Sequence, residues 1–215
     1  MMLSSAGSLL QAFRRPGYLQ SAAPLALHDL DTGDLVLFSG RTPAARLVQG
    51  VTGSYWSHVG LIVRLPGEDE PLLWECTRAS QVADILYGQP LDGVQLVSLS
   101  AKVEAYSGEV AIRRLLDAGA GHTRYQRLQP LMRDWHARPY CNFAVKRLRV
   151  WGGGKKAAHW RHGGFCSEFV AEVYKRLRLL PRGLRTQDVV PRDFSPDTGL
   201  PLLRGQLSPV CLLRL

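Results

Sequence analysis

The sequence has only four cysteines among 215 residues, and none of them belongs to a CxxC pair. A chain of this size with so few, widely spaced cysteines does not indicate a disulfide framework. It also has no apolar run near the roughly 18 to 20 residues that a membrane-spanning helix needs. Internal repeats and low-complexity tracts are absent as well. These absences predict one folded domain in a reducing, cytoplasmic setting.

The first 28 residues contain no acidic side chain, whereas Arg14 and Arg15 follow a short apolar piece. A basic, serine-containing segment of this kind faintly resembles an organelle transit peptide. The other interpretation is a short leading helix packed on the domain. We therefore treat residues 1–28 as an N-terminal extension or leading helix and residues 29–215 as the domain, and organelle targeting stays open.

The net charge of +9 is unevenly distributed. Residues 1–109 hold 7 basic and 11 acidic side chains, whereas residues 110–215 hold 20 basic and 7 acidic ones. Such a basic half is typical of proteins with an anionic partner, although a merely solvated surface explains it equally well. We expect Lys155, Lys156 and Arg161 to lie at the site entrance and to bind an anionic substrate.

Strand-like segments dominate the first half of the chain, and helical patterns follow in the second half. This order favours the α+β class. The predicted strands cover 33–40, 57–65, 71–78, 93–99, 108–115 and 208–215. Residues 57–65 and 71–78 are expected to form an antiparallel hairpin. The predicted helices cover 41–53 and 123–138, where Pro130 starts a new segment or bends the second one, and the segment that follows Cys166.

Cys166 stands in the stretch "GGFCSEFVAEVYKRLRLL", where a loop becomes an amphipathic helix. The apolar residues from Phe169 to Leu180 recur at helical spacing, and Cys166 shares their face. A buried cysteine is most often a small apolar residue. At the start of a helix, however, free N–H groups and the helix dipole favour the thiolate. Cys166 is therefore a candidate nucleophile, whereas Cys76, Cys141 and Cys211 are expected to be structural.

A nucleophilic cysteine needs a base, which is usually a histidine oriented by a third polar group. His58 opens one predicted strand, and Glu75 lies within the next, apolar one. A carboxylate in such a strand needs a partner. His58 and Glu75 share a face only if the numbers of paired residues sum to an odd value, as when Gly60 lies opposite Glu75, because a slip of one residue turns Glu75 away.

Several segments resemble, in their order, the permuted papain-like NlpC/P60 enzymes of the YiiX-like amidase group. They are "GDLVLF", "SHVGLIV", "WECT", "RPYCNF", "FCSEFV" and "VVPRDFSP", and they span roughly residues 30 to 198. The resemblance implies a circularly permuted papain-like fold, in which an antiparallel sheet packs against the helix that carries the cysteine. In this permuted order the histidine and the carboxylate precede the cysteine.

The resemblance also implies roles for individual residues. Cys166 would be the nucleophile, His58 the base and later the acid, and Glu75 the group that orients the imidazole. The Cys166 N–H would supply one oxyanion donor. Tyr140 matches a tyrosine that lines the site or donates to the oxyanion. The acidic residue that often follows that tyrosine is Cys141 here.

The implied activity is that of a cysteine hydrolase that cleaves an amide or ester bond through an acyl-enzyme, without a cofactor. Its substrate would be a small molecule, a peptide or a lipid-like acyl compound, including lipid-linked or N-acylated amino acids, and peripheral membrane contact would fit. A lecithin–retinol acyltransferase-like transferase is one alternative. A basic nucleic-acid-binding module over residues 138–161 is the other, although no recognition motif accompanies it. A zinc site at His159, His162 and Cys166 lacks a familiar spacing.

Overall fold

The computed structural model describes residues 14–19, 25–78, 80–141 and 164–213. The predicted basic loop, with Lys155, Lys156, Arg161 and the histidines at 159 and 162, therefore lies outside the described residues. Most of the predicted N-terminal extension lies outside them too. Within it, Gly17–Leu19 forms one 3-10 turn, and Leu19 is buried in the core.

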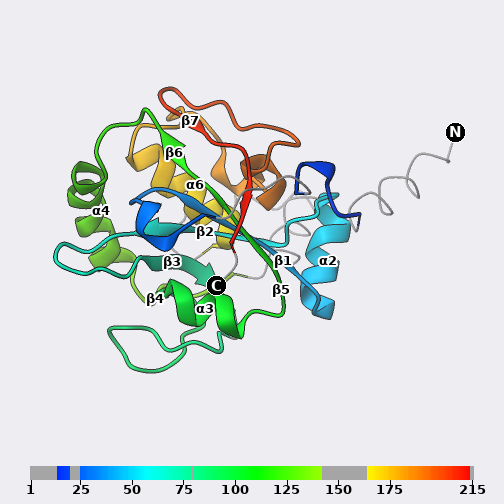
Figure 1. Ribbon diagram of the computed structural model, residues 1–215, viewed down its shortest axis with the longest axis horizontal. Helices are drawn as coiled ribbons and strands as arrows, with labels where there is room; N and C mark the ends of the chain where they lie inside the picture. Colours follow the sequence, from blue (N-terminus) through cyan, green and yellow to red (C-terminus); the bar gives the residue numbers. More distant parts are fainter. Residues whose placement is uncertain (1–13, 20–24, 79, 142–163, 214–215) are drawn as a thin grey trace, which may run out of the picture.

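A six-stranded antiparallel sheet forms the centre of the molecule (Figure 1). Its spatial order is β4-β3-β2-β1-β5-β8. The strands are β1 Leu35–Gly40, β2 His58–Val63, β3 Leu72–Thr77, β4 Gly93–Ser98, β5 Gly108–Arg113 and β8 Cys211–Leu212. The α+β class and the first five predicted strands are confirmed. The sixth is shorter than expected, because only two residues of the last segment pair with β5.

The hairpin has a register that places His58 and Glu75 on the same face of the sheet. Leu61 pairs with Trp74 and Val63 with Leu72, and the next step in this register brings Gly60 opposite Glu75. Pairing between β2 and β3 ends at Leu61 and Trp74, whereas β3 and β4 stay paired as far as Thr77 and Gly93. The sheet therefore opens between β2 and β3 at the end that carries His58.

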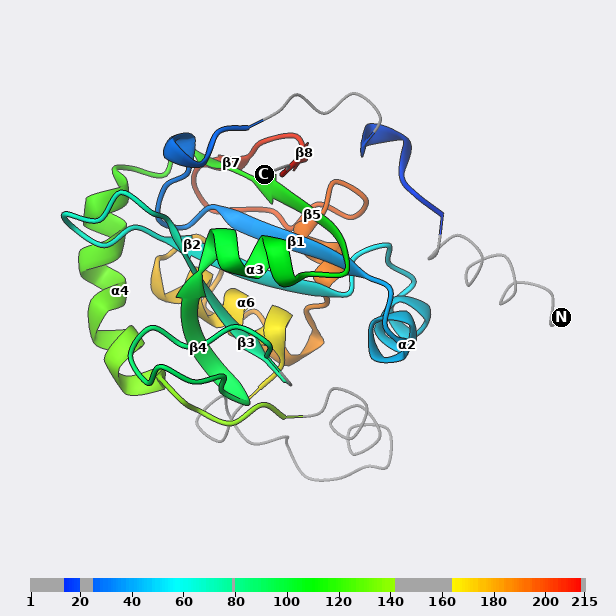
Figure 2. The same ribbon diagram turned by 60° about the horizontal axis from the view of Figure 1, so that its bottom comes forward.

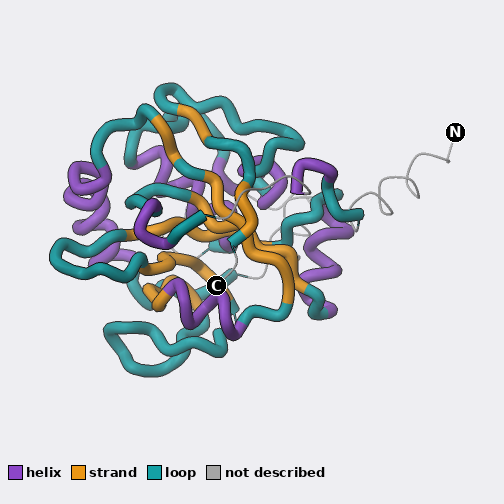
Figure 3. Tube along the Cα trace, viewed as in Figure 1, coloured by secondary structure: helices purple, strands orange, loops and turns teal. Residues whose placement is uncertain are grey.

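Helices cover both faces of the sheet (Figures 2 and 3). The described helices are α2 Pro43–Thr52, α3 Leu99–Ala105, α4 Gly121–Trp135 and α6 Cys166–Arg176. The helix at α3 was not predicted, because its seven residues are too few for a clear periodicity. Helix α4 runs through Pro130 as one element, so the prediction of a new segment at that position is wrong.

The side chains of the sheet divide into two apolar layers, because neighbours along a strand point to opposite faces. Leu61, Trp74 and Cys76 belong to the layer that contains Phe169 of α6. Ile62 belongs to the other layer, with Phe38, Leu73 and Leu99 of α3. Helix α6 therefore packs on one face of the sheet, and α3 packs on the other.

A second, two-stranded sheet was not predicted from the sequence. It joins β6 Leu115–Leu116 to β7 Gln206–Leu207. The buried Arg113 at the end of β5 joins that strand to the segment around β7. Its guanidinium donates to the carbonyl oxygens of Phe194, Leu207 and Ser208. Among the described residues, no helix combines the length and the apolar character needed to cross a bilayer.

Candidate active site

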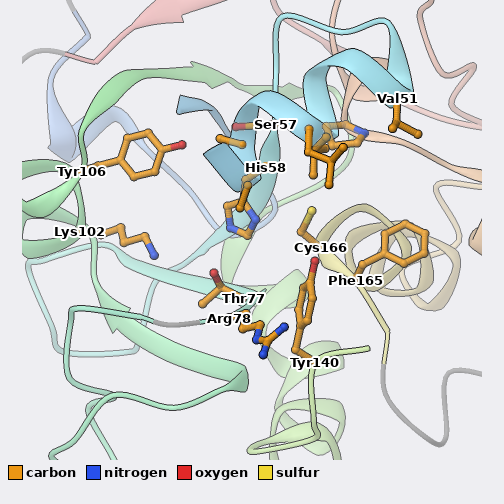
Figure 4. Close-up of a pocket in the computed structure, with 15 residues that line it drawn as sticks. Val51, Ser57, His58, Thr77, Arg78, Lys102, Tyr106, Tyr140, Phe165 and Cys166 are labelled. Carbon is orange, nitrogen blue, oxygen red and sulfur yellow. The ribbon is translucent and has the colours of Figure 1, made fainter. Parts of the chain in front are cut away.

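A cavity of about 330 Å³ lies where the sheet opens, between β2, the start of α6 and helix α2 (Figure 4). Its size is at the lower end of the range of roughly 300 to 1,000 Å³ that is typical of ligand pockets. Cys166, His58 and Tyr140 all line it. Glu75 lies beneath His58 and is completely buried.

Cys166 is the first residue of α6 and is only 6% exposed. The apolar stripe of this helix is buried as the sequence predicted, with Phe169, Val173 and Tyr174 fully inaccessible. The Tyr174 hydroxyl also donates to the Gly33 carbonyl oxygen over 2.7 Å. This packing fixes the helix start, so that the Cys166 sulfur lies beside the His58 ring (Figure 4).

His58 connects the thiol to the carboxylate. Its Nε2 lies 2.6 Å from Glu75 Oε2, and the ring lies beside the Cys166 side chain (Figure 4). The ring packs against Phe38 with centroids 5.3 Å apart. Burial lowers the pKa of His58, but the Cys166 sulfur and the Glu75 carboxylate outweigh burial and raise the pKa to about 9. Both neighbours therefore favour the protonated imidazole.

Glu75 stays ionised although it is buried. Burial raises its pKa, but Lys102 and then His58 oppose burial and hold the pKa at about 2. Lys102 Nζ lies 2.6 Å from Oε1, and the Gln95 amide donates to the same oxygen over 2.8 Å. Both carboxylate oxygens are thus occupied by donors, which compensates for the loss of water.

Sequence reasoning missed Lys102 and Gln95. Gln95 stands directly opposite Glu75 in the pairing of β3 with β4. Lys102 comes from α3, where it is almost buried. Leu99, Val103 and Tyr106 are spaced as one helical face, and Lys102 lies on that face. A lysine on a short apolar stripe is the signal that would have indicated a buried ion pair.

Tyr140 lines the cavity on the far side of Cys166 from α2 (Figure 4). Its backbone forms an isolated parallel bridge with Gly164, and its hydroxyl points toward Cys166 (Figure 4). Burial, followed by the neighbouring Cys166, raises the pKa of Tyr140 above its ordinary value. The phenol therefore keeps its proton and is able to donate a hydrogen bond into the cavity.

The other cysteines lie in different environments. Cys76 is completely buried, its Sγ lies 3.3 Å from the Gly164 carbonyl oxygen, and burial raises the pKa of its thiol well above the ordinary value. Cys141 and Cys211 are partly exposed. All four cysteines are free. No group of three or more metal-ligating side chains occurs in the described parts of the chain.

Gly60 provides a first prediction about this site. A Cβ at that position would lie 2.7 Å from Leu73 Cδ1 and 3.2 Å from Glu75 Cβ. We expect Gly60→Ala to displace Glu75 and to lower the free energy of unfolding by about 1 to 3 kcal/mol. Thermal unfolding measures this loss. Gly183→Ala is the matched control, because its Cβ would meet no atom within 4 Å. Equal melting temperatures for the two variants would contradict the close approach.

Comparison with known proteins gave few matches. No family model and no curated protein matches the chain. Among solved structures, the chain is similar to the metalloprotein YiiX from Escherichia coli O157:H7, described as DUF1105. The sequences are 16% identical, and the match covers 86% of this chain and 97% of that one, with a TM-score of 0.49.

Proposed function

We propose that the protein is a cysteine hydrolase that cleaves an amide or ester bond through a covalent acyl-enzyme. The observation that carries this proposal is the contact of 2.6 Å between His58 and Glu75, beside a cavity-lining thiol. A cysteine, a histidine and an orienting carboxylate form the arrangement used for nucleophilic catalysis. Lys102 and Gln95 are positioning residues, because they contact Glu75 and not the thiol.

In the proposed reaction, the Cys166 thiolate forms a bond to the acyl carbon and the carbonyl electron pair moves to oxygen. The Cys166 N–H at the start of α6 and the Tyr140 hydroxyl are the candidate donors to that oxygen. The C–N or C–O bond then breaks as the His58 imidazolium gives its proton to the leaving atom. Water attacks the thioester while His58 takes a proton from it. The C–S bond breaks, the acid leaves, and the ion pair is restored.

Trapping the acyl-enzyme tests this function. We expect a panel of p-nitrophenyl acyl esters to give a mass increase equal to one acyl group, located on Cys166 by peptide mass spectrometry. Cys211→Ala is the matched control, because it removes a free cysteine from β8 at the other end of the sheet order. It should acylate like the native protein. Acylation that persists in Cys166→Ala would refute the proposal.

A further inference from the structure

Helix α2 buries a polar side chain and exposes apolar ones. Gln49 is completely buried, and its amide donates to the Tyr55 carbonyl oxygen over 2.8 Å and to Ser39 Oγ over 3.1 Å. Leu47 and Val51 are instead 59% and 55% exposed. Amphipathic helices of folded domains normally do the reverse. Polar contacts therefore hold α2 against the sheet, and its apolar face stays exposed.

That apolar face borders the cavity. The lining residues contributed by α2 recur at helical spacing: Ala44, Leu47, Val48 and Val51, with Ala45 beside them. Thr42 caps the start of the helix and Gly53 ends it in a left-handed conformation, so the sequence fixes this element firmly. The wall beside Cys166 is consequently built for an apolar group.

The opposite side of the cavity carries an exposed cation. Arg78 follows β3 and lines the cavity beside Tyr140, with Cys166 and His58 between it and Val51 (Figure 4). It is exposed, and it makes no ion pair with any of the residues that the structure describes. Lys102, the other lining residue with a permanent charge, is already bound to Glu75. Arg78 is therefore available to an anion in the cavity.

We propose that the substrate is an anionic acyl compound whose acyl chain lies on the apolar face of α2 and whose leaving group carries a negative charge that Arg78 binds. The inference rests on the proposed function, because the acyl carbon between these two ends is the atom that Cys166 attacks. A carboxylate and a phosphate both satisfy a guanidinium with two parallel hydrogen bonds. The shared chemistry is an acyl chain joined through one carbonyl to an anion.

Binding to the Cys166→Ala protein tests the inference without turnover. The carboxylate pair of probes is N-dodecanoylglycine and N-dodecanoylglycinamide, and the phosphate pair is 1-dodecanoylglycerol 3-phosphate and 1-dodecanoylglycerol. We expect calorimetry to show about 10-fold tighter binding of the anion than of its neutral partner in at least one pair. The pair that shows the preference identifies the anion.

Variants then show which residues bind the anionic end of the probe and which bind its acyl chain. Arg78→Gln should abolish the preference for the anion, Arg78→Lys should restore part of it, and the exposed Arg182→Gln should leave it intact. Val51→Asn should weaken both members of a pair equally. Equal binding of anion and neutral compound in both pairs, or a preference that survives Arg78→Gln, would overturn the inference. Unchanged binding by Val51→Asn would show that the acyl chain does not lie on α2.

The two proposals can fail separately. If the anion and its neutral partner bind equally while neutral esters acylate Cys166 normally, only the inference about substrate class is refuted. A preserved preference without any acylation would refute the cysteine hydrolase and leave an anion-selective binding cavity.

Discussion

Cys166→Ala should lose hydrolytic activity by about 10⁴-fold or more, because the variant has no atom that can form the acyl-enzyme. The fold should persist, since the change removes one small sulfur at a helix start. Steady-state kinetics on the ester or amide that acylates the native protein gives the loss in kcat. Cys211→Ala provides the control and should retain full activity. A Cys166→Ala protein that turns over at the native rate would exclude covalent catalysis by this thiol.

The same substitution should change the titration of His58. The Cys166 sulfur is one of the groups that raise the pKa of this imidazole to about 9, so its removal should lower the pKa. The Glu75 carboxylate remains and still favours the protonated ring. Titration of the ring by NMR measures the shift, and Cys211→Ala should show none. An unchanged His58 pKa would mean that the thiol and the imidazole do not interact.

Lys102→Met should be the most destabilising substitution near the site. It leaves the fully buried Glu75 carboxylate with His58 and Gln95 as its partners. Removal of one member of a buried ion pair costs about 3 to 5 kcal/mol, and we expect the lower end because two donors remain. Chemical denaturation measures the loss. Lys175→Met is the matched control, because Lys175 pairs at 3.4 Å with the partly exposed Glu172 and should contribute much less.

Acid should reduce the difference in the free energy of unfolding between the native protein and Lys102→Met. Lys102 is the strongest of the groups that hold the pKa of Glu75 at about 2, below its ordinary value of 4.5. A lowered carboxyl pKa stabilises the folded state above the ordinary value and ceases to do so as the pH falls toward the lowered one. The native protein should therefore lose more stability than Lys102→Met between pH 4.5 and pH 2. If the difference in stability between the two proteins stays constant over that pH range, the destabilisation by Lys102→Met comes from lost packing rather than from lost charge.

Much of this site was predictable because its signals are local. The two apolar runs predict the hairpin of β2 and β3, and a register such as Gly60 opposite Glu75 places Glu75 on the face of His58. The apolar stripe that starts at Phe169 likewise fixes which side of α6 is buried, and with it the position of Cys166. The structure brings these residues together, whereas their chemical roles remain a proposal.

The rest depends on contacts that no local pattern reveals. Lys102 lies 27 residues beyond Glu75, on a helix too short to produce a clear period. The apolar face of α2 looks in the sequence like a core-facing stripe, yet the burial of Gln49 turns it toward the cavity. Arg78 belongs to the half of the chain with a negative net charge, whereas the charge distribution predicted anion binding in the basic half. Each of these features follows from tertiary packing.

The order of the site elements along the chain has a consequence for biosynthesis. Phe38, which packs against His58, belongs to the layer with α3, whereas Cys166 belongs to the layer with α6. Strands β1 to β5 and α3 precede α6 in the chain, so His58, Glu75 and Lys102 are synthesised before the proposed nucleophile. Under the proposed chemistry, the chain becomes reactive only after α6 has docked on the sheet. A truncated or stalled chain would therefore be inert toward acyl compounds in the cell.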